Sequence, residues 1–218
     1  MPILQCQHVS YAPQQTPILK DISLTVETGD FISVTGPSGS GKSTLLKLFS
    51  DLLSPTEGQF LFNGSPYETY RPTALRMQVA YCFQTPHLFG ETVEDNLRFP
   101  FHIRKEKYDP DRVSALFEEF RMSPDQLSKR IGTLSGGEKQ RISLIRSLLF
   151  LPAVLLLDEI TSALDVDNTA LVESIIRRRH EQGITILWVT HSPEQSRRHA
   201  NRLLTLEDGS IRSLEAIR

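Results

Sequence analysis

The feature that most constrains the fold is a glycine-rich loop at residues 36–44, with the sequence Gly-Pro-Ser-Gly-Ser-Gly-Lys-Ser-Thr. An apolar, strand-like run over residues 31–35 precedes it, and a helix-like run over residues 42–53 follows it. With the spacing G-x-x-x-x-G-K-[ST], bare backbone N–H groups can surround phosphate oxygens, and the start of the next helix points its positive end at the anion. The sequence therefore predicts a strand, a phosphate-binding loop and a helix, in that order.

Two side chains of the loop have expected roles beyond the backbone. Lys42 is predicted to reach the β- and γ-phosphates of a nucleotide, and the Ser43 hydroxyl is predicted to bind Mg²⁺. A plain glycine turn between a strand and a helix is the simpler alternative. The flanking strand and helix patterns favour the phosphate-binding interpretation.

Composition narrows the classes of function. The chain has 218 residues, a formal net charge of −2 and 23% charged residues, so its overall balance gives no reason to expect a nucleic-acid partner. Two cysteines, Cys6 and Cys82, cannot build a disulfide framework, which favours a reducing compartment. We expect no secretion signal, because residues 1–8 lack a basic flank followed by an apolar core. The most apolar window, residues 144–157, is too short and too interrupted to span a membrane.

Hydrophobic patterns along the chain predict an α/β fold. The turn at residues 27–30 is expected to join strands 22–26 and 31–35 in a hairpin, and Asn63-Gly64 marks a second tight turn. Strand patterns disappear from residue 84 to about 130, where apolar residues fall at helical spacing. Parallel pairing is expected for strands 154–157 and 185–189, because a helical pattern at 167–181 separates them. Further expected strands are 3–9, 59–62 and 79–83, and residues 202–206 and 210–214 are expected to form a hairpin.

An acidic pair marks the second expected element of the site. Asp158 and Glu159 follow the continuous apolar run 154–157, which fits a buried central strand. The carboxyl end of such a strand is where an α/β sheet presents ligands. Asp158 is predicted to hold Mg²⁺ through water, and Glu159 to polarise the water that attacks the γ-phosphate. An acidic strand end without catalytic function is the alternative for a chain that lacks a phosphate loop.

The most specific motif is Leu-Ser-Gly-Gly-Glu at residues 134–138, just before a helical pattern that runs to Phe150. Ser135 can cap that helix, and Gly136 and Gly137 leave the backbone bare for an anion. These residues resemble the signature motif of the ATP-binding subunits of ABC transporters. The resemblance extends over almost the whole chain, and it implies a phosphate-loop NTPase core with a mainly parallel sheet, an antiparallel β-subdomain and a helical subdomain.

Further residues match the family pattern one by one. Tyr11 corresponds to the aromatic that stacks on adenine, Gln84 to the glutamine that senses Mg²⁺ and the attacking water, and His191 to the switch histidine on the γ-phosphate. Taken singly, Tyr11 would be an edge-strand aromatic, Gln84 a polar loop residue and His191 a structural or solvated histidine. Ile160 stands where many members have proline, which affects no catalytic group.

The resemblance thus implies four sets of site residues. The catalytic set is Lys42, Gln84, Glu159 and His191, and the metal set is Ser43, Gln84 and Asp158. The ATP-binding set is Tyr11, Gly36, Pro37, Ser38, Gly39, Ser40, Gly41, Lys42, Ser43, Thr44, Ser135, Gly136 and Gly137. The loop that crosses between subunits is Ser162, Ala163, Leu164 and Asp165.

The family also implies an organisation and partners. Residues 1–218 would form one cassette, with 1–84 and 146–218 as core and antiparallel β-subdomain and 85–145 as helical subdomain. Two chains would dimerise head to tail around two ATP molecules with Mg²⁺. They would work with a separate integral membrane permease, at the cytoplasmic face of the inner membrane, as peripheral subunits.

Some stretches resemble one branch of the family, and others suggest a surface for the membrane partner. Residues 84–100 and 158–165 look like a bacterial branch associated with iron export. The aromatic runs 86–90 and 97–101 form either a groove for a permease helix or the ordinary packing of a small helical subdomain.

Two alternative functions make different predictions for the sequence. A soluble ABC-type ATPase of DNA repair or translation typically has a long coiled-coil insertion or tandem cassettes, whereas this sequence shows one cassette and no heptad run. A nucleotide-binding regulator without turnover would fit a chain that lacked Glu159 or His191, and both are present.

Overall fold

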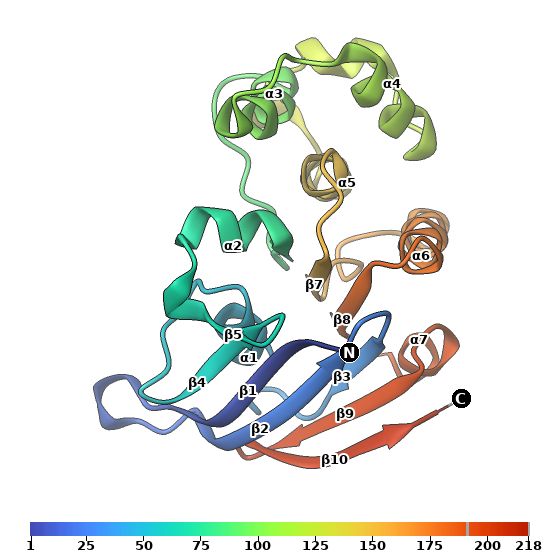
Figure 1. Ribbon diagram of the computed structural model, residues 1–218. Coiled ribbons are helices and arrows are strands. Elements are labelled where there is room, and N and C mark those ends of the chain that lie inside the picture. The colour runs from blue at the N-terminus through green and yellow to red at the C-terminus, as the bar shows by residue number, and fades with distance from the viewer. Residues whose placement is uncertain (191, 218) are drawn as a thin grey trace. The chain divides into compact units, whose positions relative to one another are not determined.

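The computed structural model describes residues 1–190 and 192–217 and contains two compact units (Figure 1). The first unit comprises Met1–Tyr81, Pro152–Glu159 and His180–Arg218, and the second comprises Cys82–Leu151 and Ile160–Arg179. The division into subdomains at residues 84 and 146 stays a prediction.

An antiparallel sheet of four strands lies in the first unit. Its order is β2 (Leu19–Glu27), β1 (Pro2–Tyr11), β4 (Glu57–Phe62) and β5 (Ser65–Pro66). β2 alternates buried and exposed residues along much of its length, as a strand with one face on a core does. Asn63 and Gly64 join β4 to β5 with φ of 49° and 76°, the left-handed values that a type I′ hairpin turn requires.

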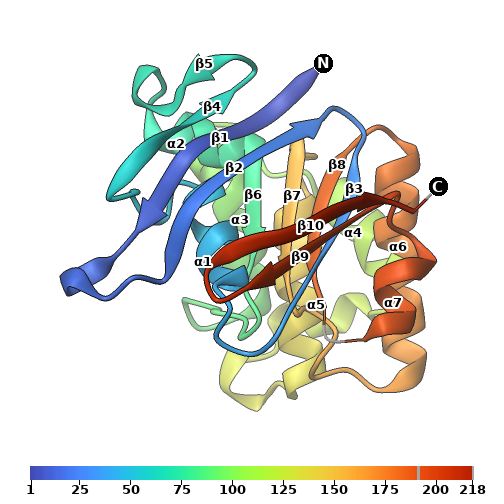
Figure 2. The same cartoon turned by 90° about the horizontal axis from the view of Figure 1, so that it is seen from below.

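A second sheet has six strands in the order β10 (Ser210–Ala216), β9 (Arg202–Glu207), β3 (Phe31–Thr35), β8 (Thr185–Val189), β7 (Val154–Asp158) and β6 (Val79–Cys82). β3 pairs in parallel with both β8 and β9, and β7 pairs in parallel with β8, which confirms the expected parallel pairing. All residues of β7 and β8 are buried, as in a sheet covered on both faces. β9 and β10 form the expected antiparallel hairpin, drawn in red in Figure 2.

The hairpin expected between residues 22–26 and 31–35 is wrong. The turn itself exists, because the Asp30 amide donates to the Glu27 carbonyl at 3.0 Å and Gly29 has φ of 81°. β2 nevertheless pairs with β1, while β3 enters the other sheet between β8 and β9. The physical reason lies in the burial of β3, whose first four residues are all buried, so that a partly solvated hairpin cannot accommodate it.

Helix α1 (Lys42–Phe49) follows β3 and supplies part of the core of the first unit. Its apolar residues Leu45, Leu46, Leu48 and Phe49 are buried. It ends earlier than the predicted residue 53, because Asp51 adopts a left-handed φ of 56° and the Leu52 amide returns to the Lys47 carbonyl at 2.9 Å. The unit also contains two short helices, α2 (Pro72–Gln78) and α7 (Pro193–Arg198), and the 3₁₀ turns η1 (Pro13–Gln15) and η2 (Tyr67–Thr69).

The second unit is helical, as the sequence predicts. It contains α3 (Val93–Arg104), α4 (Pro110–Glu119), α5 (Gly136–Leu148), most of α6 (Val166–Glu181) and the 3₁₀ turns η3 (Pro124–Ser128) and η4 (Ile131–Thr133). Thr92 and Asp95 form a capping box that fixes the start of α3. Within residues 1–190 and 192–217, none of the helices combines the length and apolar character needed to cross a bilayer.

Candidate active site

The phosphate loop between β3 and α1 has a backbone that only glycine can adopt at two positions. Gly36 has φ of 140°, and a Cβ there would lie 2.0 Å from the Leu206 carbonyl oxygen. Gly41 has φ of 99°, and a Cβ there would lie 2.5 Å from Cδ2 of Leu19. At Gly36 the close neighbour is backbone, and at Gly41 it is the end of a leucine side chain, while φ is unfavourable for other residues at both places. The glycines at the two ends of the motif therefore set the path of the loop.

Lys42 lies at the first position of α1 with its ammonium group inside the loop. Nζ donates hydrogen bonds to the carbonyl oxygens of Gly36 at 2.9 Å and Pro37 at 2.8 Å. Burial lowers the pKa of this ammonium group, and the nearby carboxylates of Glu159 and Asp158 act to raise it. A cation is thus enclosed by the loop and faces two carboxylates.

Asp158 ends β7 and accepts a hydrogen bond at each carboxylate oxygen. The Ser43 hydroxyl donates to Oδ1 at 2.9 Å, and the Tyr81 hydroxyl donates to Oδ2 at 2.6 Å. The Asp158 side chain is buried, so these hydrogen bonds act where water competes little. The structure thereby joins three residues that lie far apart in the sequence.

Sequence reasoning had placed Ser43 and Asp158 at the site and had missed Tyr81. The sequence predicts Tyr81 only as a residue of the strand at 79–83. A usable signal was available, because β6 neighbours β7 in the sheet and strand ends at one edge of a sheet bring their residues together. That signal requires the order of the strands, which hydrophobic patterns do not give.

The donor set of Ser43 and Asp158 fits Mg²⁺. Mg²⁺ prefers hard oxygen ligands, and it commonly keeps several waters while binding one or two protein groups and the substrate phosphates. A serine hydroxyl and a buried carboxylate 2.9 Å apart provide such oxygens beside the phosphate loop. Ser40 adds a buried hydroxyl oxygen that has no hydrogen-bond partner within the described part of the chain.

Glu159 follows β7 directly and has an unusual backbone. Its φ is 47°, in the left-handed region that residues other than glycine rarely adopt, and its amide donates to the Val189 carbonyl at 3.1 Å. Such a conformation costs about 1–3 kcal/mol and tends to occur at functional sites. β7 ends at Asp158, so this left-handed residue comes immediately after the strand.

The remaining predicted residues of the first unit lie around the same elements. Tyr11 ends β1, partly buried against the core of the unit, and its carbonyl accepts the Ile18 amide at 2.9 Å. The other loop residues of the ATP-binding set, Pro37, Ser38, Gly39 and Thr44, lie between Gly36 and the first turn of α1. The predicted switch residue His191 lies outside the described residues.

In the second unit, the signature motif forms the start of α5. Ser135 is the N-cap: its Oγ accepts the Glu138 amide at 3.2 Å, and the Ser135 amide donates to Oε2 of Glu138 at 2.8 Å. These hydrogen bonds, with an ion pair from Lys129 at 3.2 Å, lower the pKa of the Glu138 carboxyl. A Cβ built on Gly136 would meet open space among the described residues. The motif is therefore a rigid helix start with an uncovered backbone.

The predicted dimer loop contacts this motif in the same unit. A Cβ on Gly137 would lie 3.4 Å from Cδ2 of Leu164. Asp165 accepts the Asn168 amide at 2.8 Å, and this hydrogen bond lowers the pKa of its carboxyl. The structure thus brings together residues 135–137 and 162–165. Gln84, which is exposed, belongs to the same unit.

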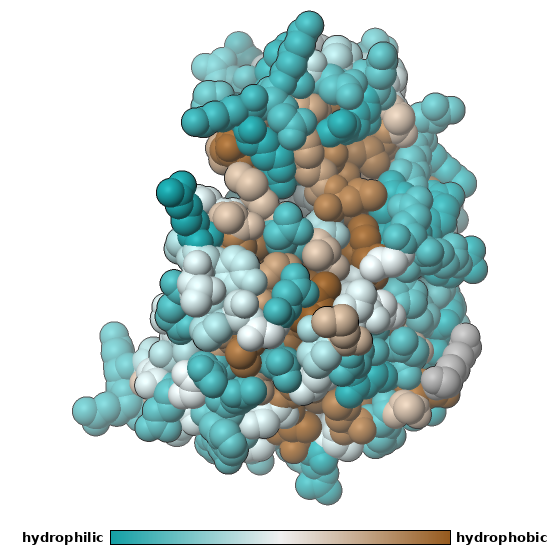
Figure 3. All heavy atoms as spheres, viewed as in Figure 1, coloured by the Kyte–Doolittle hydropathy of each residue, from teal (hydrophilic) through white to brown (hydrophobic). Residues whose placement is uncertain are grey.

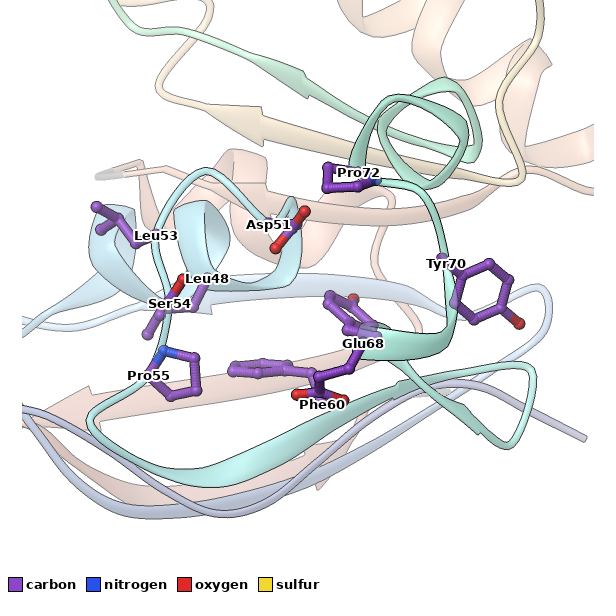
Figure 4. Close-up of a pocket in the computed structure, with 10 residues that line it drawn as sticks. Leu48, Asp51, Leu53, Ser54, Pro55, Phe60, Glu68, Tyr70 and Pro72 are labelled. Carbon is purple, nitrogen blue, oxygen red and sulfur yellow. The ribbon is translucent and has the colours of Figure 1, made fainter.

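A separate hollow of about 300 Å³ lies in the first unit, between the end of α1 and the segment that contains η2 and the start of α2 (Figure 4). The hydroxyl of Tyr67 donates to the Phe49 carbonyl at 2.8 Å, and that of Tyr70 donates to the Phe62 carbonyl at 2.9 Å. Both tyrosines therefore already use their hydroxyl groups in the fold. The sequence patterns predict no function for this region. Its lining consists of Leu48, Asp51, Leu53, Ser54, Pro55, Phe60, Tyr67, Glu68, Tyr70 and Pro72.

Comparison with known sequences identifies a family and its relatives. Residues 19–162 match the sequence model of the family described as "ABC transporter". The chain is 50% identical over 207 residues to the "Probable iron export ATP-binding protein FetA" of Escherichia coli strain K12, covering 94% of this chain and 92% of that protein. It is 35% identical to the "Energy-coupling factor transporter ATP-binding protein EcfA1" of Halalkalibacterium halodurans, covering 96% of this chain and 76% of that protein.

Solved structures share the fold over nearly the whole chain. A dimeric ATP-binding cassette in a post-hydrolysis state, bound to ADP and Pi, superposes with a TM-score of 0.89 at 25% identity and covers 99% of both chains. The ATP-binding subunit of an ABC transporter superposes with a TM-score of 0.90 at 26% identity, covering 99% of this chain and 90% of that one.

Proposed function

Since the chain belongs to the ABC transporter family and is one of its ATP-binding ATPase subunits, we propose that it hydrolyses ATP between the phosphate loop and the acidic end of β7. One observation carries this assignment of the site. The Ser43 hydroxyl donates to the buried Asp158 carboxylate at 2.9 Å, beside a loop that already encloses the Lys42 ammonium group. A nucleoside triphosphate with its metal requires a cation and a hydroxyl at the start of a helix, here Lys42 and Ser43, and a carboxylate close by, here Asp158.

The residues of the loop bind the phosphates. Backbone N–H groups of the loop at residues 36–44, which Pro37 lacks, donate to phosphate oxygens, and Lys42 exchanges its two carbonyl partners for the β- and γ-phosphates. The Ser40 hydroxyl, which has no hydrogen-bond partner among residues 1–190 and 192–217, donates to the same anion. Tyr11 stacks on the adenine base, as the family resemblance implies.

Ser43 and Asp158 would hold Mg²⁺, together with Gln84 as the family resemblance implies, and the metal would neutralise charge on the phosphates during transfer. Glu159 accepts a proton from the attacking water, and Gln84 orients that water. His191, which the structure does not describe, contacts the γ-phosphate in this proposal. In this proposal the phosphate loop positions the phosphates, while Glu159 and Gln84 act on the attacking water.

A second copy of the chain completes the site. Ser135 and the amides of Gly136 and Gly137 from that copy cover the γ-phosphate, so two chains join head to tail around two ATP molecules. Support comes from the uncovered backbone at Gly136 and from its place in the first turn of α5, where amides are not used within the helix. ATP thereby links the two chains, and its hydrolysis releases them. Residues Ser162, Ala163, Leu164 and Asp165 form the loop between subunits.

The membrane partner is an integral permease, which docks on the second unit while the ATPase stays peripheral at the cytoplasmic face. Phe89 and Phe99 are 40% and 42% exposed, and their rings pack edge to face with centroids 4.8 Å apart. Ile103 is equally exposed, whereas Phe101 is buried. Figure 3 shows brown apolar side chains reaching the surface among teal ones where Figure 1 draws α3 and α5. An exposed aromatic pair of this kind suits the apolar face of a short partner helix.

Replacing Phe89 by aspartate tests the docking surface. Phe89→Asp is expected to abolish stimulation of ATP hydrolysis by the permease and to leave the hydrolysis rate of the isolated subunit within about two-fold, because a charge opposes burial under the partner helix. Leu214→Asp, at an exposed apolar position on β10, is the control and should retain stimulation. An equal loss of both rates in Phe89→Asp would mean that the aromatic pair is packing of the second unit.

We propose metal export, with iron as the metal, for the complete transporter. This rests on the 50% identity to a relative named as a probable iron export ATP-binding protein and on the resemblance of residues 84–100 and 158–165 to that branch. The substrate itself would be recognised by the permease.

The test of the whole proposal is purification of the tagged chain from host membranes in mild detergent with ATP. We expect a polytopic membrane protein in a stoichiometric complex, which on reconstitution moves iron in an ATP-dependent manner. Recovery of only ribosomal or nucleic-acid partners would contradict the transport assignment. Recovery of a permease that moves another substrate would contradict the iron assignment alone.

A further inference from the structure

Asp158 is held on both sides by hydroxyl groups, and one of these belongs to a residue with no role so far. Ser43 donates to Oδ1, while Tyr81 donates to Oδ2 at 2.6 Å, within the normal range for a hydroxyl on a carboxylate. Tyr81 comes from β6, a different element from the phosphate loop and from β7. The plane of the carboxylate is therefore defined by two donors on separate elements.

This arrangement affects what the carboxylate can bind. A carboxylate at the end of a strand can rotate about its last side-chain bond, which changes the direction of its oxygens toward a metal. With Oδ2 engaged by Tyr81, rotation breaks a charge-assisted hydrogen bond in a buried place. Oδ1 is thus kept directed at the Ser43 hydroxyl, the other group in the donor set for Mg²⁺.

The two common divalent cations respond differently to such a constraint. Mg²⁺ requires nearly ideal octahedral geometry at short distances, whereas Ca²⁺ accepts flexible ligands and variable coordination numbers. A carboxylate fixed in one orientation favours the cation with the stricter geometry. Loss of the constraint should therefore reduce Mg²⁺ binding more than Ca²⁺ binding.

We propose that Tyr81 is a positioning residue that orients Asp158 for Mg²⁺ and so sets the preference of the nucleotide site for Mg²⁺ over Ca²⁺. The inference rests on the proposed nucleotide site and deepens it. Tyr81 acts through Asp158 and needs no contact with the nucleotide.

The experiment compares binding of a non-hydrolysable ATP analogue with Mg²⁺, with Ca²⁺ and with EDTA, by isothermal titration calorimetry on Tyr81→Phe and the wild type. The variant removes one hydroxyl and keeps the ring. We expect analogue binding in EDTA to stay within about two-fold of wild type, the affinity gained from Mg²⁺ to fall about ten-fold, and the affinity gained from Ca²⁺ to change less than about three-fold. Tyr70→Phe is the matched control, because it removes a half-buried hydroxyl that donates to the Phe62 carbonyl in the same unit.

A double-mutant cycle with Asp158→Asn tests the route of the effect. If Tyr81 acts through the carboxylate, adding Tyr81→Phe to Asp158→Asn should change the Mg²⁺ dependence by less than about two-fold. The proposal is overturned if Tyr81→Phe keeps the wild-type ratio of Mg²⁺ to Ca²⁺ affinity, if the Tyr70→Phe control shifts it equally, or if the two changes are additive. Should the wild type itself bind the analogue no more tightly with Mg²⁺ than in EDTA, the proposed metal site fails, which is a distinct result.

Discussion

Glu159→Gln should lower the rate of ATP turnover by about 100-fold or more while ATP affinity stays within a few-fold of wild type. Glutamine fills nearly the same volume but cannot accept a proton from water at neutral pH, and a positioned general base contributes a factor of this size. The Lys42 ammonium and the Ser43–Asp158 pair, which are assigned to phosphate and metal binding, remain intact. Phosphate release measures the turnover, and equilibrium titration measures the affinity.

The same variant should accumulate as an ATP-bound dimer, because the γ-phosphate that joins the two chains is no longer removed. Size-exclusion chromatography with and without ATP gives this readout. Glu215→Gln, at an exposed position on β10, is the control and should hydrolyse ATP at the wild-type rate. A Glu159→Gln protein that also turns over at the wild-type rate would assign the base to another residue.

Gly36→Ala should destabilise the first unit by about 2–6 kcal/mol. The new Cβ would lie 2.0 Å from the Leu206 carbonyl oxygen, and φ of 140° is outside the range of alanine. Overpacking and forced backbone strain each cost about 1–3 kcal/mol. For a chain of this length, such a loss corresponds to a fall in melting temperature of about 10 °C, measured by calorimetry, together with weaker ATP binding.

Gly39→Ala separates the two causes. Gly39 also has a left-handed φ, of 80°, but a Cβ there would meet nothing within 4 Å among the described residues. The expected cost is therefore the backbone term alone, about 1–2 kcal/mol. If both substitutions lower the melting temperature equally, the contact with Leu206 has no part in holding the loop.

Local patterns predict which residues carry the chemistry of the site better than they predict which residues contact one another. The phosphate loop and the Asp158–Glu159 pair were found because each depends on a few consecutive residues at a strand end. Tyr81 was missed, since its contact with Asp158 depends on the order of strands in the sheet, which hydrophobic periodicity does not reveal. Likewise, the contact of Leu164 with Gly137 joins two motifs whose proximity no local pattern contains.

The errors in the fold have the same origin. The turn after β2 was correctly predicted, but a turn does not decide which strands pair, and β3 found partners on both sides in the other sheet. The end of α1 was misplaced because residues 50–53 are compatible with a helix, while the structure closes the helix with a left-handed residue at Asp51. Boundaries of this kind depend on the tertiary environment.

The parallel pairing of β3 also has a consequence for the order in which the protein is made. Phe31 pairs with Ile186, and Thr35, which leads into the phosphate loop, pairs with Thr205. A ribosome synthesises the loop early, but the strands that support it on both sides emerge only near the end of the chain. Contacts so distant in sequence form slowly, since a long segment must first be closed. Nascent chains should therefore acquire the ability to bind nucleotide late, after β8 and β9 have left the ribosome.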